Sequence, residues 1–231
     1  MSVPARRRAA HAVAALAAAC AWCAASPSAQ TEKASPSPHA AATDSFDELY
    51  AKGKRLNDSM KTLTARFTET TTSSLLTRPL VARGRVAVER PARIALRYSE
   101  PDARTVLIDG NTMTMSWPSR GVRQVSNIAT TQARIQKYFV NGTPGDLRRE
   151  FTIEDRGAGG DRPNDYAIAM LPKRKQIREN LARLDLWVNR TTLLLDAMKM
   201  TFASGDTKTM TFEDVVPNAP IPPGSFSVDP D

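Results

Sequence analysis

Cysteine and histidine, the side chains most often used as nucleophiles, bases and metal ligands, are confined to the start of this 231-residue chain. The two cysteines are Cys20 and Cys23, and the two histidines are His11 and His39. The sequence beyond His39 therefore excludes Ser-His-Asp and Cys-His catalysis, a zinc site of the usual His/Cys kind and a disulfide framework. We expect the protein to need no metal and no cofactor.

Acid–base catalysis by carboxylates needs no histidine, so an enzyme of that kind is the rival hypothesis. The carboxylates available for it are Glu69, Glu89, Glu150, Glu154 and Asp155. No pair among them has a spacing that indicates catalysis, and charges that alternate along strands usually face solvent. We therefore expect no catalytic residues, and a carboxylate-based hydrolase is the weakest alternative.

The positive charge of the chain is modest. Its formal net charge is +8, from 32 Lys and Arg against 24 Asp and Glu. Arg6, Arg7 and Arg8 lie near the N-terminus, and the other cations are scattered. This pattern does not indicate a nucleic-acid partner.

With 41% hydrophobic residues, a chain of this length is able to bury a substantial core.

Residues 1–25 have the pattern of a secretory signal peptide. The arginines at 6–8 precede an apolar run from Ala12 to Ala25, shorter than the roughly 20 residues that span a bilayer. We expect Sec export to the periplasm as a soluble protein, with a form lipid-anchored at Cys20 as the minor alternative. Residues 26–43, rich in Ser, Pro and Ala, predict a flexible tether. We expect a single domain over residues 44–231.

The rest of the chain alternates mainly between apolar and polar side chains with the period of β-strands. Helical spacing is limited to residues 45–61 and about 130–140, with a turn near 144–149. The Asp109-Gly110 pair predicts a tight hairpin. The expected strands are 63–68, 85–89, 94–98, 105–108, 112–117, 150–154, 165–171, 181–189, 193–202 and 207–213, with a last edge strand at Phe226 and Val228.

This order of elements predicts one antiparallel sheet with helices packed on it. Two forms of that sheet are compatible with the pattern. A closed barrel would fill its own interior with side chains, whereas a curved open sheet would leave an apolar face for the helices to cover. Composition does not choose between them.

The first half of the predicted sheet contains the segment ARGRVAVERPARIALRYSEP at 82–101, followed by VLIDGNTM at 106–113. A strand ending in Arg-Pro, an alternating apolar strand, a proline turn and an Asp-Gly hairpin thus occur in order. In this order and spacing the chain resembles the LolA-type periplasmic outer-membrane lipoprotein carriers. The resemblance extends more loosely over most of residues 45–230.

The resemblance implies an α+β fold: a half-open, incomplete antiparallel β-barrel with helices forming a lid over an apolar cavity. It implies a monomeric, non-enzymatic carrier that takes acylated lipoproteins or related envelope lipids from an inner-membrane donor transporter to an outer-membrane acceptor. Arg90 takes the position of the family's lid latch. The cavity residues we assign on this basis are Phe67, Val86, Val88, Ile94, Leu96, Val106, Met113, Met115 and Trp117. Alternation alone favours a filled core at these positions, and the resemblance favours a cavity.

A basic cluster in a predicted hairpin loop is the remaining candidate site. It consists of Lys173, Arg174, Lys175 and Arg178. Such a cluster is attracted to anionic head groups or to an acidic partner, and the alternative is a loop that only improves solubility. For the whole protein, the alternative to a carrier is a periplasmic module that senses lipids or lipoproteins, or an anchored outer-membrane acceptor.

Overall fold

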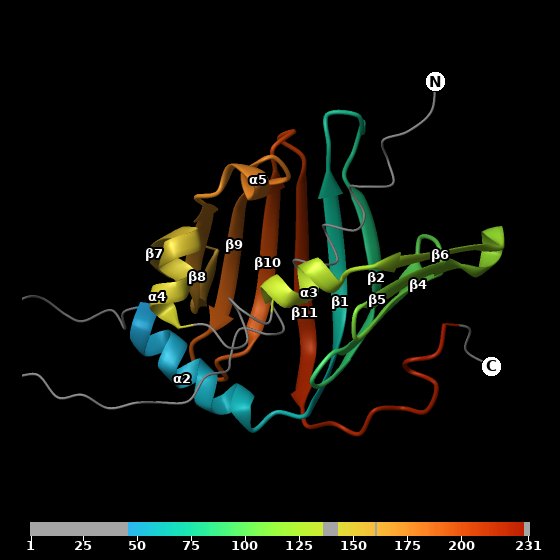
Figure 1. Ribbon diagram of the computed structural model, residues 1–231, viewed down its shortest axis with the longest axis horizontal. Helices are drawn as coiled ribbons and strands as arrows, with labels where there is room; N and C mark the ends of the chain where they lie inside the picture. Colours follow the sequence, from blue (N-terminus) through green and yellow to red (C-terminus); the bar gives the residue numbers. More distant parts are fainter. Residues whose placement is uncertain (1–45, 136–142, 160, 229–231) are drawn as a thin grey trace, which may run out of the picture.

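The computed structural model describes residues 46–135, 143–159 and 161–228. The predicted signal peptide at 1–25 and tether at 26–43 lie outside these residues, so the domain boundaries stay a prediction. The strands of the described part form one eleven-stranded sheet in which neighbouring strands are antiparallel. Figure 1 shows this sheet as strongly twisted.

The first half of the chain supplies six consecutive strands. They are β1 (Thr62–Thr72), β2 (Leu80–Glu89), β3 (Arg93–Glu100), β4 (Arg104–Asp109), β5 (Thr112–Trp117) and β6 (Val122–Asn127). The predicted hairpin joins β4 to β5, and Gly110 adopts a φ of 55° there, a conformation that favours glycine. The sequence pattern missed β6, because this strand is largely exposed and shows no buried apolar alternation.

The second half supplies the remaining strands, β7 (Phe151–Gly159), β8 (Arg162–Pro172), β9 (Leu181–Asn189), β10 (Leu195–Phe202) and β11 (Thr207–Pro217). Strand β11 pairs with β1 and so joins the halves in the order β6-β5-β4-β3-β2-β1-β11-β10-β9-β8-β7. Strands β6 and β7 are the two edges, so the sheet is open. The predicted fold class, an open antiparallel barrel with helices, is confirmed.

Three helices lie against one face of this sheet (Figure 1), which we call the helix-covered face. They are α2 (Phe46–Asp58), α3 (Ala129–Ile135) and α4 (Pro144–Glu150). The continuation of α3 predicted to residue 140 lies outside the described residues. Two short helices, η1 (Pro118–Arg120) and α5 (Lys175–Arg178), occupy connections between strands. None of the helices described here is long and apolar enough to cross a membrane.

Helix α4 forms where a turn was predicted at 144–149, and its start is well capped. The Thr143 hydroxyl accepts the backbone N–H of Asp146 at 3.1 Å, and the Asp146 carboxylate accepts the Thr143 N–H at 2.8 Å. This reciprocal pair is a capping box, and Pro144 fits the first helical position. The hydrogen bonds from Thr143 also hold the pKa of Asp146 below its usual range. Helix α4 then buries Leu147 completely.

The C-terminal tail after β11 crosses the opposite face of the sheet, which we call the outer face. The predicted edge strand at Phe226 and Val228 is wrong, because residues 223–228 form turns and a bend. An Arg97 guanidinium nitrogen donates to the carbonyls of Gly224 and Ser227 at 2.6 and 2.7 Å, and the Arg93 guanidinium lies 4.3 Å from the centre of the Phe226 ring. The four prolines between 217 and 223 lack the N–H donors that a strand needs.

Candidate functional site

The strand register places the predicted cavity residues on one face of the sheet. Val86 lies opposite Leu96, Leu96 opposite Val106, and Val106 opposite Met115. Directly opposite residues of antiparallel strands project to the same side. A second row, two residues further along each strand, consists of Val88, Ile94, Ile108 and Met113. The structure therefore brings these residues together as one apolar surface.

This surface is the floor of the core beneath the helices. Seven of the predicted residues are buried: Phe67, Val86, Ile94, Leu96, Val106, Met113 and Met115. Val88 and Trp117 are half-buried and pack against the same cluster. The Phe67 ring meets Tyr98 edge-on at 4.9 Å. Helices α2 and α4 contribute Phe46, Leu49, Tyr50 and Leu147 to this core.

The second half of the sheet extends the apolar surface, which the assignment from sequence missed. Buried Met198 lies opposite Met210 and opposite Leu186, which continues the face across β11, β10 and β9. Strand β8 adds buried Ile168 and Met170. The alternation Met198-x-Met200 was the signal available for these residues. Six of the eight methionines are buried here: Met113, Met115, Met170, Met198, Met200 and Met210.

Helix α3 is anchored at the end of the sheet where β4 turns into β5. The buried Gln132 side-chain amide donates to the Gly110 carbonyl at 2.9 Å, and the Ile128 N–H donates to the Asn111 carbonyl at 2.7 Å. Half-buried Arg90 lies in the neighbouring β2–β3 turn. The Gly110 N–H donates to the Ala92 carbonyl of that turn at 3.1 Å. The predicted latch thus lies close to the hairpin that holds α3.

A polar cluster interrupts the apolar face near the opposite end of the sheet. The buried Glu69 carboxylate accepts the Tyr98 hydroxyl at 2.8 Å, Arg104 at 3.3 Å and Lys208 at 2.9 Å. The Arg104 guanidinium also stacks over the Tyr98 ring at 3.8 Å. Burial raises the pKa of Tyr98 well above its ordinary value, and the nearby Glu69 charge raises it further. Tyr98 is therefore a protonated donor to Glu69.

The basic cluster divides into two pairs. Arg174 makes a two-pronged contact with the buried Glu150 carboxylate, at 2.5 and 2.6 Å, and Lys173 donates to the Arg148 carbonyl at 2.5 Å. These two residues hold the end of α4 to the β8–β9 connection. Lys175 and Arg178 are exposed on α5. Among the described residues, this second pair makes no contact with α4.

The carboxylates considered for acid–base chemistry all have donors beside them. Glu89 contacts Arg93 at 2.7 Å, Glu154 contacts Arg156 at 3.6 Å, and Asp155 accepts the Gly157 N–H at 2.8 Å; Glu69 and Glu150 have the partners described above. In the described parts of the chain, no group of three or more His, Cys, Asp or Glu side chains is arranged to hold a metal ion.

The sequence was compared with models of known protein families. The family model of the outer membrane lipoprotein carrier protein LolA matches residues 58–229. This match covers most of the described sheet, including both halves of the apolar face. No curated protein matches the sequence significantly.

Several solved structures are similar to this chain at low sequence identity. An uncharacterized conserved protein from Thermus thermophilus is 6% identical, with a TM-score of 0.50 over 79% of this chain and 93% of that chain. The Mycobacterium tuberculosis lipoprotein LppX is 11% identical, with a TM-score of 0.48 over 78% and 96%. A LolA superfamily protein from Nitrosomonas europaea is 10% identical, with a TM-score of 0.36 over 73% and 91%. The similarity to the Thermus protein is one of fold.

Proposed function

The chain belongs to the family of the outer membrane lipoprotein carrier protein LolA, and from this we propose that it binds acyl chains on its helix-covered face and carries them between membranes. The cargo is an acylated lipoprotein or a related envelope lipid. The route runs through the periplasm, from an inner-membrane donor transporter to an outer-membrane acceptor. The protein acts as a monomer and without catalysis, which agrees with membership of a carrier family rather than a known enzyme family.

The observation that supports this proposal is the apolar face beneath the helices, which extends over both halves of the sheet. Each buried CH₂ of an acyl chain contributes about 0.8 kcal/mol, so even one chain gives substantial affinity. Methionine adapts to irregular shapes better than branched side chains do. The six buried methionines on this face therefore suit chains of variable length.

The helices form the lid, and α3 is the part whose anchoring we propose to be labile. A single side-chain hydrogen bond, from Gln132 to Gly110, joins the described part of α3 to the β4–β5 turn. Arg90 acts as a second latch at the same end. Opening of α3 would expose part of the helix-covered face.

Weakening this anchor is expected to speed release of cargo. One buried hydrogen bond contributes about 1 kcal/mol, so Gln132→Leu is expected to raise the dissociation rate of a fluorescent fatty acid about fivefold. Arg90→Leu is expected to change release more than uptake. Both rates are measured by stopped-flow fluorescence, with Gln176→Leu on exposed α5 as the control. Wild-type release rates in both variants would contradict the lid assignment.

The end of the sheet at the β1–β2 connection is the proposed contact with a membrane or partner. Leu75 and Leu76 in that connection are 84% and 41% exposed. The pairing of Thr72 with Thr207, and of Phe202 with Leu181, places the β8–β9 connection at the same end. Exposed Lys175 and Arg178 therefore lie on the same end of the sheet as the exposed leucines. Apolar and basic groups together are the combination that favours an anionic interface.

The proposed function is tested by asking whether the full chain binds acyl chains and where. Protein prepared without detergent is analysed by native mass spectrometry before and after addition of a diacylated lipopeptide. A diazirine-tagged fatty acid then maps the contact residues. We expect stoichiometric binding and adducts on strands β2–β5 at Val86, Leu96, Val106 and Met115. Absence of binding, or adducts on the outer face, would contradict the proposal and favour a filled core at these positions.

A variant gives an independent test of the same surface. Leu96→Glu places a charge where the side chain is only 1% exposed, and we expect it to reduce lipopeptide binding at least tenfold. Circular dichroism reports whether the variant folds. Glu100→Gln, at the exposed end of the same strand, is the control. Undiminished binding by a folded Leu96→Glu protein would show that this face does not hold the acyl chain.

A further inference from the structure

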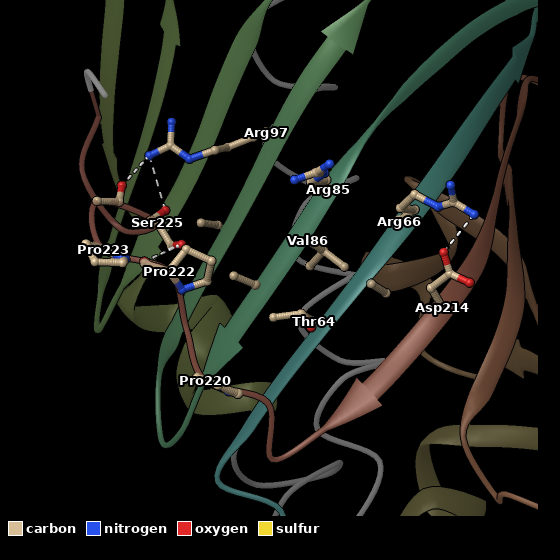
Figure 2. A pocket seen from close by; sticks show the side chains of 14 residues that line it. Thr64, Arg66, Arg85, Val86, Arg97, Asp214, Pro220, Pro222, Pro223 and Ser225 are labelled. Atoms are coloured by element: carbon tan, nitrogen blue, oxygen red, sulfur yellow. Dashed lines mark hydrogen bonds and ion pairs between the residues drawn. The ribbon is translucent and has the colours of Figure 1, made fainter. Parts of the chain in front are cut away.

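The outer face carries three arginines in one register row, which we call the arginine row. Arg66 on β1 lies opposite Arg85 on β2, and Arg85 lies opposite Arg97 on β3. Like charges directly opposite each other on neighbouring strands destabilise a sheet. Figure 2 shows Arg85 between the other two arginines, near the prolines of the C-terminal tail. The repulsion between these three charges must therefore be offset by negative charge nearby.

The protein compensates only one end of the row with opposite charge. Arg66 contacts the Asp214 carboxylate at 2.7 Å and Glu213 at 3.4 Å. Arg97 donates to backbone carbonyls of the tail, which are neutral and leave its charge in place. Arg85 is exposed, and no carboxylate of the described residues lies within ion-pair distance of it. Two adjacent guanidinium charges, on Arg85 and Arg97, therefore have no counter-charge among the residues described.

The row lies in a half-open pocket on the outer face. The pocket has a volume of about 590 Å³. Its floor is the outer face of β1–β3, including Thr64, Ala87 and Ala95, and one wall is the tail at Pro220, Pro222, Pro223 and Ser225. Proline restricts the backbone of this wall, and the contacts of Arg97 with Gly224 and Ser227 hold it against the sheet. Apolar walls around cations strengthen their attraction for an anion.

We propose that Arg85, together with Arg97, binds a phosphate group in this pocket. Neighbouring strands are about 4.8 Å apart, so Arg85 and Arg97 start close enough together for both side chains to reach the oxygens of one phosphate. Guanidinium groups bind phosphate through paired N–H donors. A phosphate monoester carries a charge of about −1.5 to −2 and three acceptor oxygens, which matches two arginines better than the single charge of a carboxylate. The pocket has room for a small ester beyond the phosphate, and Arg66, already neutralised, forms its far side.

The phosphate belongs either to a small soluble ester or to a phospholipid head group. Isothermal titration calorimetry with inorganic phosphate and glycerol phosphate tests the first source. Sedimentation with phosphatidylglycerol vesicles, compared with phosphatidylcholine vesicles, tests the second. The full chain is used in every arm. Binding of the soluble esters identifies the first source, whereas binding confined to the anionic vesicles identifies the second.

Arg85→Gln is the decisive variant, because an exposed residue without an ion pair to the described part of the fold is replaceable at little cost in stability. We expect it to weaken phosphate binding at least about tenfold, since a hydrogen bond to a charged group contributes strongly. Arg123→Gln, an equal charge change at an exposed position on β6, is expected to leave binding unchanged. Unchanged affinity in Arg85→Gln, or no binding of phosphate in any arm, would overturn the proposal. So would tighter binding of an acidic peptide than of phosphate.

Discussion

Replacing Gly84 with alanine is expected to destabilise the protein by about 3 kcal/mol or more, which is the upper range for overpacking. An alanine Cβ at this position would lie 2.2 Å from the carbonyl oxygen of Arg97 and 2.8 Å from Cζ of Phe67. The first clash is with the backbone of the neighbouring strand, which is unable to move without breaking the sheet. Strands β2 and β3 would have to separate beside the apolar face.

Gly145→Ala is the matched control for this substitution. The nearest atom to a Cβ there is the Thr143 hydroxyl oxygen at 3.6 Å, an ordinary contact. Alanine also favours helix over glycine, so this change in α4 is expected to be neutral or slightly stabilising. Urea unfolding followed by circular dichroism measures both variants. A Gly84→Ala protein about as stable as wild type would show that β2 and β3 are less closely packed than the structure indicates.

Replacing Glu69 with glutamine is expected to cost about 3 kcal/mol, because breaking a buried ionic contact leaves its partners uncompensated. Two cations, Arg104 and Lys208, share this one carboxylate, and their side chains are only 26% and 20% exposed. Glutamine preserves the size of the side chain and an acceptor for the Tyr98 hydroxyl. The loss therefore reports the charge and not the packing.

The control for Glu69→Gln is Glu100→Gln, which removes the carboxylate of the exposed ion pair with Arg83. Exposed pairs of this kind contribute at most about 1 kcal/mol, so little change is expected. Urea unfolding at pH 7 gives the stabilities. As a second readout, the pKa of Tyr98 is expected to fall in Glu69→Gln, because the Glu69 charge contributes to raising it. Equal stability of both variants would show that the polar cluster does not contribute to the stability of the fold.

Local patterns in the sequence were sufficient to predict which side of the sheet most residues face. Alternation on β3 places Leu96 on the helix-covered face and Arg97 on the outer face, because side chains of a strand alternate with period two. The hairpin at Asp109-Gly110 was predictable for the same local reason. Strand β6 and the tail were not, since an exposed strand and a proline-rich segment carry no such periodicity.

The clusters that distinguish this protein depend on contacts between distant parts of the chain. Glu69 is separated from Arg104 by 35 residues and from Lys208 by 139, and no local pattern links them. Gln132 in α3 meets Gly110 only because β6 folds back beside β5. The arginine row likewise depends on the register of β1, β2 and β3. Alternation in the sequence does not fix this register, because shifting a strand by two residues keeps every side chain on the same face.

The sequence by itself determined the composition of the two faces, the absence of cysteine and histidine after residue 39, and the resemblance to the LolA carriers. The tertiary structure decided the pairing of β1 with β11, the open edges at β6 and β7, and the side-chain clusters on each face. The physical reason is the distance along the chain over which the residues involved interact. Strand periodicity is written into neighbouring residues, whereas register and sheet order are set by how distant segments pack into one core.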